Sequence, residues 1–408
     1  MTKPEAIQIF LEIAAQLRHE QLLNDGMGVV KAALRGDDGM AYYARLYGAS
    51  ANDLTVQECR IEEADEPFLR AFFIKPEAKA LLLLCGTYAL RIAETSNYLT
   101  AELDDMAQIV GLTARVAKSL SESELSRCLK NRNSCFVRNQ GMLLTGRAAS
   151  EAMTGAILLE KAAMTHILAK QIGGAKRVPL FSAALMHSIY QKKYSKINLE
   201  EESVRAEAKQ PKPAAEQPER SKREQELCEA IVACGIRLVD EGLVQGTWGN
   251  IAVRLDETSM LCTPSGLAYH YLTPDDIVKV DLATLEFGSQ RKPTSEKRLH
   301  RDLFAARPDV GASIHTHAKR CGVFAAACKT LCCISGEMKE LVGAEMRCAG
   351  HALPSTKKLS KVALSALENR NGCLLMNHGV LCCGSDLEQA YRACKAAEQA
   401  AGEQLGLE

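Results

Sequence analysis

The sequence lacks several features that would place the protein in a particular class. No apolar run reaches about 18 residues without a charge, the length that a membrane span requires, so no membrane-spanning segment is expected. Basic and acidic residues balance at 50 each, and such a chain has no electrostatic footprint for nucleic acid or for an anionic membrane surface. We therefore expect neither a nucleic acid nor a membrane as a partner.

The sequence also lacks the cysteine spacing of a zinc finger, although it holds 16 cysteines. No C-x-x-C pair recurs at that spacing, and the opening MTKPEAIQIF has no apolar signal region that would indicate secretion and disulfides. Many cysteines stand in apolar runs, such as LCCI at 331–334, where a thiol behaves as a small buried hydrophobe. We expect buried thiols in the reducing cytoplasm.

Apolar residues make up 47% of the 408 residues, enough for two cores in a chain too long for one ordinary domain. The stretch at 198–226 is charged, contains several prolines and lacks aromatic residues, so it cannot bury apolar surface. We expect domains at 1–196 and 225–408, joined by a flexible charged linker at 197–224. An amphipathic helix over 225–241 begins the second domain.

The two halves of the chain contain a repeated pattern. NRNSCFVRNQGMLLTG at 131–146 matches NRNGCLLMNHGVLCCG at 369–384, and the same offset pairs Glu160 with Glu398. Each copy is typical of a buried strand, a glycine turn, a second short strand and a following helix. The pattern predicts a tandem duplication of one fold.

The two copies differ at the positions where chemistry would occur. Gln140 in the first copy stands where the second has His378. An alignment of CGTYA at 85–89 with IHTHA at 314–318 removes the other two histidines as well. We therefore expect the first domain to be a degenerate copy without metal ligands.

The second domain has the pattern of a mixed α/β structure. Short β runs are predicted at 250–255, 260–263 and 277–281, followed by a helix at 296–307 and a strand at 312–317. Helices mixed with short, mostly antiparallel strands indicate a layered α/β fold rather than a Rossmann repeat.

Three histidines of this domain have the pattern of a metal site. His315 and His317 are two residues apart, so on a strand both side chains leave one face, roughly 6.5–7 Å apart along the chain. His378 lies just before Gly379 at a strand end. Three neutral imidazoles with an open position describe a catalytic Zn²⁺ site. The alternative is two core histidines and one turn histidine, each satisfied separately by hydrogen bonds.

Other candidates lie in turns and at a helix start. Glu296, in KPTSEKRLH, is either a residue of a helix cap in which Thr294 or Ser295 caps the first turn, or a base beside the metal. The turns GTWGN at 246–250 and TPSG at 263–266 expose backbone N–H groups and hydroxyls that suit a phosphate. Thr294 and Ser295 add a helix N-terminus to this set.

These stretches resemble the class II aldolase and adducin family, in particular L-fuculose-phosphate aldolase-like enzymes. The resemblance covers nearly all of residues 225–402, and the N-terminal half is weakly similar to the same family. It implies a three-layer α/β fold with a mainly antiparallel central sheet, here in two tandem copies. The matching stretches are GTWGNIAVR (246–254), LCTPSGLAYHYLTPDDIVKVDL (261–282), KPTSEKRLH (292–300), RPDVGASIHTHA (307–318) and LLMNHGVLCCGSDLEQA (374–390).

The resemblance also implies roles for individual residues. His315, His317 and His378 would bind Zn²⁺ or another divalent metal such as Mn²⁺, and Glu296 would be the acid/base. His351 takes the place where such aldolases have a Tyr that donates a proton from the neighbouring subunit, a task that the pKa of a histidine suits. The residues implied around the substrate phosphate are Thr247, Asn250, Ser265, Gly266, Thr294 and Ser295.

The activity implied is that of a zinc-dependent aldehyde-lyase in cytoplasmic carbohydrate metabolism. Such an enzyme cleaves or forms a ketose 1-phosphate such as L-fuculose-phosphate, with dihydroxyacetone phosphate and an aldehyde as the other side of the reaction. A sugar-phosphate epimerase or dehydratase on the same scaffold is one alternative, and a non-catalytic adducin-like interaction protein is another. Family members form four-fold rings, so we also expect a homo-oligomer with active sites between subunits.

Overall fold

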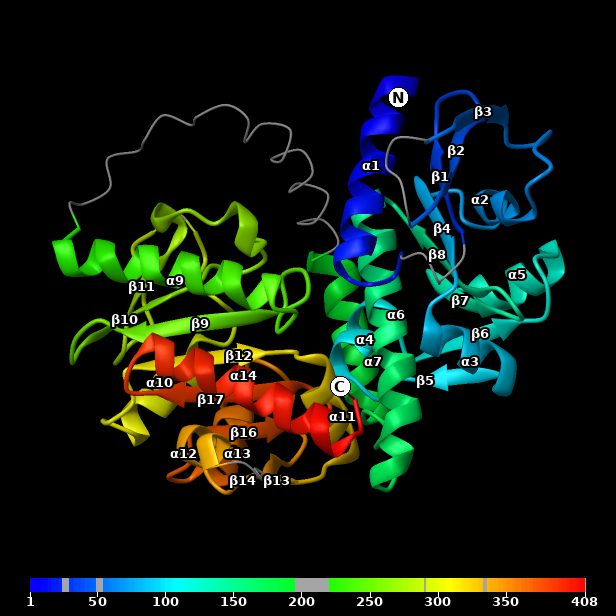
Figure 1. Ribbon diagram of the computed structural model, residues 1–408. Coiled ribbons are helices and arrows are strands. Elements are labelled where there is room, and N and C mark those ends of the chain that lie inside the picture. The colour runs from blue at the N-terminus through cyan, green and yellow to red at the C-terminus, as the bar shows by residue number, and fades with distance from the viewer. Residues whose placement is uncertain (24–28, 49–53, 195–219, 290, 333–335, 408) are drawn as a thin grey trace. The chain divides into compact units, whose positions relative to one another are not determined.

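The computed structural model describes residues 1–23, 29–48, 54–194, 220–289, 291–332 and 336–407 (Figure 1). The chain divides into two compact units, an N-terminal unit of Met1–Ile167 with Val178–Leu199 and a C-terminal unit of Leu168–Arg177 with Glu200–Glu408. Most of the predicted linker, residues 197–219, lies outside the described residues. Within the remainder of that stretch the chain becomes helical at Lys222.

Two expectations from composition can be compared with the described residues. No helix among them combines the length and the apolar character that crossing a bilayer requires. None of the cysteines within the described ranges forms a disulfide, and most of them are buried.

The N-terminal unit is built on an eight-stranded sheet in the order β3-β2-β1-β4-β8-β7-β6-β5. Neighbouring strands are antiparallel except for the parallel pair of β6 and β7. Its strands are β1 (Val30–Arg35), β2 (Met40–Leu46), β3 (Val56–Arg60), β4 (Ala80–Leu84), β5 (Tyr98–Thr100), β6 (Thr113–Ala117), β7 (Ser134–Val137) and β8 (Gly141–Gly146). Its α-helices are α1 (Lys3–His19), α2 (Ala71–Ile74), α3 (Thr87–Thr95), α4 (Asp104–Ile109), α5 (Glu122–Leu129), α6 (Ala149–Ala169) and α7 (Leu180–Ile189).

The C-terminal unit repeats this plan with a seven-stranded sheet in the order β11-β10-β9-β12-β17-β16-β15, of which only β15 and β16 are parallel among the described strands. The strands are β9 (Gly249–Arg254), β10 (Ser259–Cys262), β11 (Val278–Asp281), β12 (Ala312–Thr316), β15 (Cys348–Ala349), β16 (Gly372–Leu375) and β17 (Gly379–Gly384), with β13 (Leu331–Cys332) and β14 (Glu345–Met346) as a separate pair. The helices are α9 (Lys222–Asp240), α10 (Lys297–Ala306), α11 (Lys319–Ala327), α12 (Gly336–Val342), α13 (Lys357–Leu367) and α14 (Leu387–Gln404).

Helices cover both faces of the C-terminal sheet. On one face α10 and α13 pack against each other and against β9, β15 and β16, and on the other α9, α11 and α14 pack together against β9, β12 and β17. The strands β10, β12, β16 and β17 are buried throughout, as expected for a sheet covered on both sides. The prediction of a three-layer α/β fold with a mainly antiparallel sheet is confirmed.

The two sheets share their strand order and their register, and we infer that the units are copies of one fold. Leu83 lies opposite Leu143 in the pair of β4 and β8, just as His315 lies opposite Leu381 in the pair of β12 and β17. Both pairings end on a glycine of the second strand, Gly146 or Gly384. The predicted alignment of CGTYA with IHTHA is therefore wrong, because it shifts β4 along β12.

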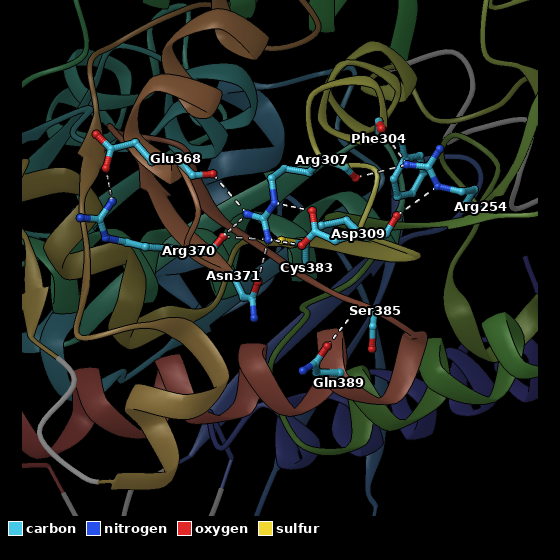
Figure 2. Close-up of polar contacts among 11 residues, drawn as sticks. Arg254, Phe304, Arg307, Asp309, Glu368, Arg370, Asn371, Cys383, Ser385 and Gln389 are labelled. Carbon is cyan, nitrogen blue, oxygen red and sulfur yellow. Dashed lines mark hydrogen bonds and ion pairs between the residues drawn. The ribbon is translucent and has the colours of Figure 1, made fainter. Parts of the chain in front are cut away.

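At one end of the C-terminal sheet, arginine side chains link neighbouring segments of the chain by hydrogen bonds (Figure 2). The Arg254 guanidinium donates from Nη2 to the carbonyl oxygen of Phe304 at 2.7 Å. Arg307 donates to the carbonyl oxygen of Glu368 at 3.2 Å and forms an ion pair with Asp309 at 2.6 Å. These bonds satisfy backbone carbonyls at the ends of α10 and α13, which would otherwise be unpaired.

Candidate active site

The three predicted ligands meet where β12 ends and β17 begins. His315 lies on β12, His317 follows directly after it, and His378 forms the turn before β17. Because β12 and β17 are antiparallel neighbours, with Thr316 opposite Val380, these positions adjoin in space. The ring centroids are 4.7–5.0 Å apart, and one ligand nitrogen from each ring lies within 4.8 Å of the others.

The environment of these rings suits a divalent metal ion. All three histidines are buried, with at most 7% of the residue exposed. The Nδ1–H of His315 donates to the Val380 carbonyl at 2.9 Å, which orients its Nε2 as the ligand atom. Imidazole nitrogen is a preferred ligand of such ions, and three ligands leave a position for substrate. Within the described residues this is the single group of three or more potential ligands that converges on one point.

Glu296 directs its carboxylate toward the histidines. It occupies the N-cap position of α10, yet its side chain makes no capping hydrogen bond to the helix. Its Oε2 lies 3.2 Å from Nε2 of His315, and its Oε1 lies 3.6 Å from Nε2 of His378. A carboxylate at an N-cap normally accepts from the first turn, so the arrangement differs from that of an ordinary capping residue.

The histidines also determine the charge of Glu296. Burial alone would raise the pKa of this carboxyl, but His315, His378 and His317 together hold the pKa at about 2. The carboxylate is therefore ionised at neutral pH. A metal cation in the same place would favour the ionised form for the same electrostatic reason.

Two glycines permit the close approach of the strands that carry the site. A Cβ on Gly379 would lie 2.3 Å from the carbonyl oxygen of Thr316. Gly249 has a φ of +125°, and a Cβ there would lie 2.9 Å from the carbonyl oxygen of His315. Both positions therefore require glycine.

Backbone hydrogen bonds join one of the two turns predicted to bind phosphate, TPSG at 263–266, to the segment that precedes α10. The Thr294 amide donates to the Thr263 carbonyl at 2.9 Å, and the Ser265 amide donates to the Lys292 carbonyl at the same distance. The TPSG turn therefore lies alongside the residues that precede α10. The helix begins at Lys297, one residue later than predicted, and the Thr294 hydroxyl accepts from the Glu296 amide at 3.2 Å.

The exposure of these loop residues differs. The side chains of Thr247, Ser265 and Ser295 are exposed, whereas Thr294 is buried. Gly266 has a φ of +81°, which gives its turn a left-handed residue without steric cost. Exposed hydroxyls and turn N–H groups are compatible with an incoming anion.

Asn250 lies between Glu296 and a residue that the sequence analysis did not single out. Its Nδ2 donates to Oε2 of Glu296 at 3.3 Å, while its Oδ1 lies 2.5 Å from Nε2 of His300. On the other side of the ring, Nδ1 of His300 lies 2.6 Å from Oγ of Ser313. The four-residue spacing of Glu296 and His300 on one helix face was the available signal for this contact.

His351 lies just after β15 and is half-buried. Burial lowers the pKa of this imidazole, and the Met376 backbone and the Asn377 side chain oppose that shift. The structure therefore places His351 beside the residues that precede His378. Its predicted role as a proton donor stays a prediction.

The N-terminal unit has other side chains at the positions of the three ligands. The shared register matches His315 to Leu83 and His317 to Cys85, and the repeated sequence matches His378 to Gln140. Leu83 belongs to an apolar core cluster, and Gln140 is exposed. None of these three described residues is an imidazole, so the unit lacks the ligand set even with the corrected alignment.

Comparison with known proteins gives matches to aldolases. The family model described as Class II Aldolase and Adducin N-terminal domain matches residues 229–405. The 5-methylthioribulose-1-phosphate/5-deoxyribulose-1-phosphate aldolase of Rhodospirillum rubrum is 39% identical over 160 residues, which cover 39% of this chain and 72% of the relative. The L-fuculose phosphate aldolase of Escherichia coli K12 is 34% identical over 164 residues, covering 40% and 75%.

Solved structures give a similar result. An L-fuculose 1-phosphate aldolase is 30% identical, with a TM-score of 0.42, and the alignment covers 45% of this chain and 85% of that one. The L-fuculose-1-phosphate aldolase of Thermus thermophilus is 23% identical, with a TM-score of 0.41 and coverage of 46% and 94%.

Proposed function

The chain belongs to the class II aldolase and adducin family, and we propose that its C-terminal unit is a metal-dependent aldolase that cleaves or forms a ketose 1-phosphate. The observation that carries this proposal is the convergence of His315, His317 and His378 with the Glu296 carboxylate beside them. A structural role alone does not account for an ionised carboxylate and three imidazoles buried at one point, because burying such groups is costly.

His315, His317 and His378 are proposed to hold Zn²⁺, with Mn²⁺ as the other candidate. When bound, the ion would polarise the substrate carbonyl and stabilise the negative charge that develops on it. The three rings need no rearrangement to supply ligands, since they already lie within reach of one another.

Glu296 is proposed to move the proton at the carbon next to the carbonyl. In the synthetic direction its carboxylate removes that proton from dihydroxyacetone phosphate, and the carbon then bonds to the aldehyde. In cleavage the same carbon–carbon bond breaks, the aldehyde leaves, and Glu296 returns a proton to the carbon. His351 is the candidate for the proton that the aldehyde oxygen gains or loses, in the site of a neighbouring copy of the chain.

The substrate phosphate is proposed to bind in the loops around α10. Thr247, Ser265 and Ser295 offer exposed hydroxyls, and the turn at Gly266 offers backbone N–H groups. Thr294 lies beside these loops, because its amide donates a hydrogen bond to the Thr263 carbonyl. The remaining proposed contact is Asn250, whose Nδ2 has a second hydrogen besides the one directed to Glu296.

The proposed aldolase has two candidate groups of substrate, which differ in the sugar attached to the phosphate. The relatives include aldolases of L-fuculose phosphate and of 5-deoxyribulose or 5-methylthioribulose phosphate. An epimerase or dehydratase on the same scaffold is the second candidate, because it would use the same three histidines. An adducin-like interaction role suits the N-terminal unit, which lacks the ligands.

A substrate panel tests the proposal. Purified full-length protein is incubated with the 1-phosphates of fuculose, rhamnulose, ribulose, 5-deoxyribulose and 5-methylthioribulose, with and without a chelator. We expect release of dihydroxyacetone phosphate from at least one, and loss of that release with chelator. Conversion without dihydroxyacetone phosphate would favour the epimerase or dehydratase, and no turnover of any substrate by metal-loaded protein would contradict an enzymatic role.

The family resemblance also leads us to propose an oligomer with sites between subunits. Two chains would supply four family units, so a dimer can form a pseudo-four-fold ring and more chains can form a larger one. Light scattering on the active protein measures its mass directly. A stable and fully active monomer would exclude this assembly.

A further inference from the structure

We propose that His300 and Ser313 are positioning residues that fix the amide of Asn250 and, through it, the Glu296 carboxylate beside the histidines. The four side chains form a continuous series of contacts, Ser313 to His300 to Asn250 to Glu296, at 2.6, 2.5 and 3.3 Å. The inference deepens the proposed function and rests on it, because it takes Glu296 to be the acid/base.

The chemistry of the groups sets a direction for these hydrogen bonds. The Asn250 amide has its Nδ2 toward Glu296, so its Oδ1, which can only accept, faces Nε2 of His300. Nε2 must therefore carry the hydrogen. In a neutral ring Nδ1 is then the acceptor, and the Ser313 hydroxyl must donate to it. Each donor thus fixes the next group along the series.

Burial makes this arrangement specific. His300 and Ser313 are fully buried, and Asn250 is 6% exposed, so water does not compete for these atoms. Burial lowers the pKa of His300 to about 4, which keeps the ring neutral at physiological pH. Reversal of the Asn250 amide would point its oxygen at the Glu296 carboxylate and leave two acceptors facing each other, an arrangement that burial makes costly.

The N-terminal unit provides an internal comparison. The register matches Ser313 to Leu81 and Asn250 to Lys31. Leu81 belongs to an apolar core cluster, and Lys31 forms an ion pair with Glu66 at 2.8 Å. The unit that lacks the metal ligands therefore also lacks this hydrogen-bond series.

A different contact, which both units share, shows that the N-terminal unit lacks the hydrogen-bond series but keeps other features of the fold. Glu398 accepts from the Arg320 and Cys321 amides at the start of α11, and Glu160 accepts from the Tyr88 and Ala89 amides at the start of α3. Both units keep this contact, which identifies it as part of the fold. Among the described residues, the series through His300 accompanies the histidines and is missing at the matching positions Leu81 and Lys31, which indicates that it belongs to the site.

The first test measures the His300 tautomer without reference to activity. Long-range ¹H–¹⁵N correlation spectra of full-length protein labelled with ¹⁵N-histidine distinguish Nε2–H from Nδ1–H rings, and the His300→Gln variant assigns the signal. We expect His300 to carry its proton on Nε2 at neutral pH and to keep it there in Ser313→Ala, because the Asn250 oxygen still faces Nε2. The Nδ1 resonance should shift in that variant, because Nδ1 loses the hydroxyl that donates to it. A wild-type ring protonated on Nδ1 would overturn the proposal.

The second test measures catalysis with a matched control. Ser313→Ala removes the donor, whereas Ser360→Ala removes a buried hydroxyl on α13 that has no hydrogen-bond partner among the residues that the structure describes. We expect kcat for ketose 1-phosphate cleavage to fall roughly 10- to 100-fold in Ser313→Ala, the usual effect of losing an outer-shell partner. We expect Ser360→Ala to keep the wild-type kcat, Ser313→Thr to restore most of it, and all variants to retain their metal.

The outcomes separate this inference from the proposed function. Equal kcat values for Ser313→Ala and Ser360→Ala would overturn the positioning role. If the wild-type protein cleaves no ketose phosphate but shows an Nε2–H ring whose Nδ1 resonance shifts in Ser313→Ala, the aldolase proposal fails while the hydrogen-bond series stands.

Discussion

At the scale of single residues, Glu296 is the side chain whose position most needs a chemical explanation. It sits at a helix N-cap but contacts His315 and His378 instead of the helix. Removing its charge by Glu296→Gln should lower the turnover of ketose 1-phosphate by roughly 10²- to 10⁴-fold, the usual contribution of a general base. The release of dihydroxyacetone phosphate is the measurement.

The control for this substitution is Glu345→Gln, which removes a carboxylate that pairs with Arg347 at the surface. Both variants should keep their metal, because the three histidines are unchanged. Near-normal turnover in Glu296→Gln would rule out its role as the acid/base.

His300 should make stability depend on pH in a defined direction. Its pKa is about 4 in the folded protein against an ordinary value of 6.5, so between these values the unfolded chain binds more protons. Stability is then lost as the pH falls through this window, by about 1.4 kcal/mol per pH unit. The contribution is complete above pH 6.5.

Denaturant unfolding of chelator-treated protein between about pH 4.5 and 7 measures this effect without interference from metal release. The His300→Gln variant should show a shallower decline with falling pH than the wild-type protein. Identical slopes would mean that His300 does not stay neutral in the folded state.

The residues of the site differed in how far the sequence could predict them. The two-residue spacing of His315 and His317 and the glycine after His378 were sufficient to single out the three candidate ligands that the structure brings together. The role of Glu296 remained ambiguous in the sequence, because a glutamate at a helix start can serve either as a capping residue or as a catalytic base. The role of Ser313 could not be predicted, because it depends on the His300 imidazole, which α10 places beside it only in the folded protein.

At the scale of elements, the site depends on how closely β17 approaches β12. Gly379→Ala should force these strands apart, because the added Cβ would lie 2.3 Å from the Thr316 carbonyl and 3.1 Å from Cε1 of His315. We expect at least a roughly 10-fold loss of metal affinity, comparable to the loss of an outer-shell partner. Titration of the chelated protein with Zn²⁺ measures this change.

Gly288→Ala is the matched control, because no atom of the described residues lies within 4 Å of the added Cβ at that position. It should leave metal affinity unchanged. Equal affinities for the two variants would show that β12 and β17 can separate without disturbing the ligands.

The elements themselves were largely predictable, and their alignment between the two halves was not. The predicted strand at 312–317 and helix at 296–307 differ from β12 and α10 by no more than one residue at either end. The offset between the halves changes upstream of the repeated hairpin, because the chain between β4 and β8 is shorter than that between β12 and β17. Short similar strings such as CGTYA and IHTHA cannot reveal such a change, whereas hydrogen-bond register does.

At the scale of the whole molecule, two similar units should bind one metal ion and not two. The N-terminal unit has Leu83, Cys85 and Gln140 where the C-terminal unit has histidines. Elemental analysis of the purified protein should therefore give about one divalent ion per chain, since a catalytic site of this kind holds one ion on three protein ligands. His378→Ala should abolish most of that binding.

Gln140→Ala is the control at the matching position of the other unit, and it should leave the metal content unchanged. A second ion per chain that disappears in this variant would show that the N-terminal unit retains a site.

The register that the two sheets share has a practical consequence for protein engineering. Because β4 and β8 keep the pairing of β12 and β17, the triple substitution Leu83→His, Cys85→His and Gln140→His would install imidazoles at the three matching backbone positions. The N-terminal sheet is thus a scaffold for an artificial metalloprotein, and the C-terminal unit shows where the ligands should be placed.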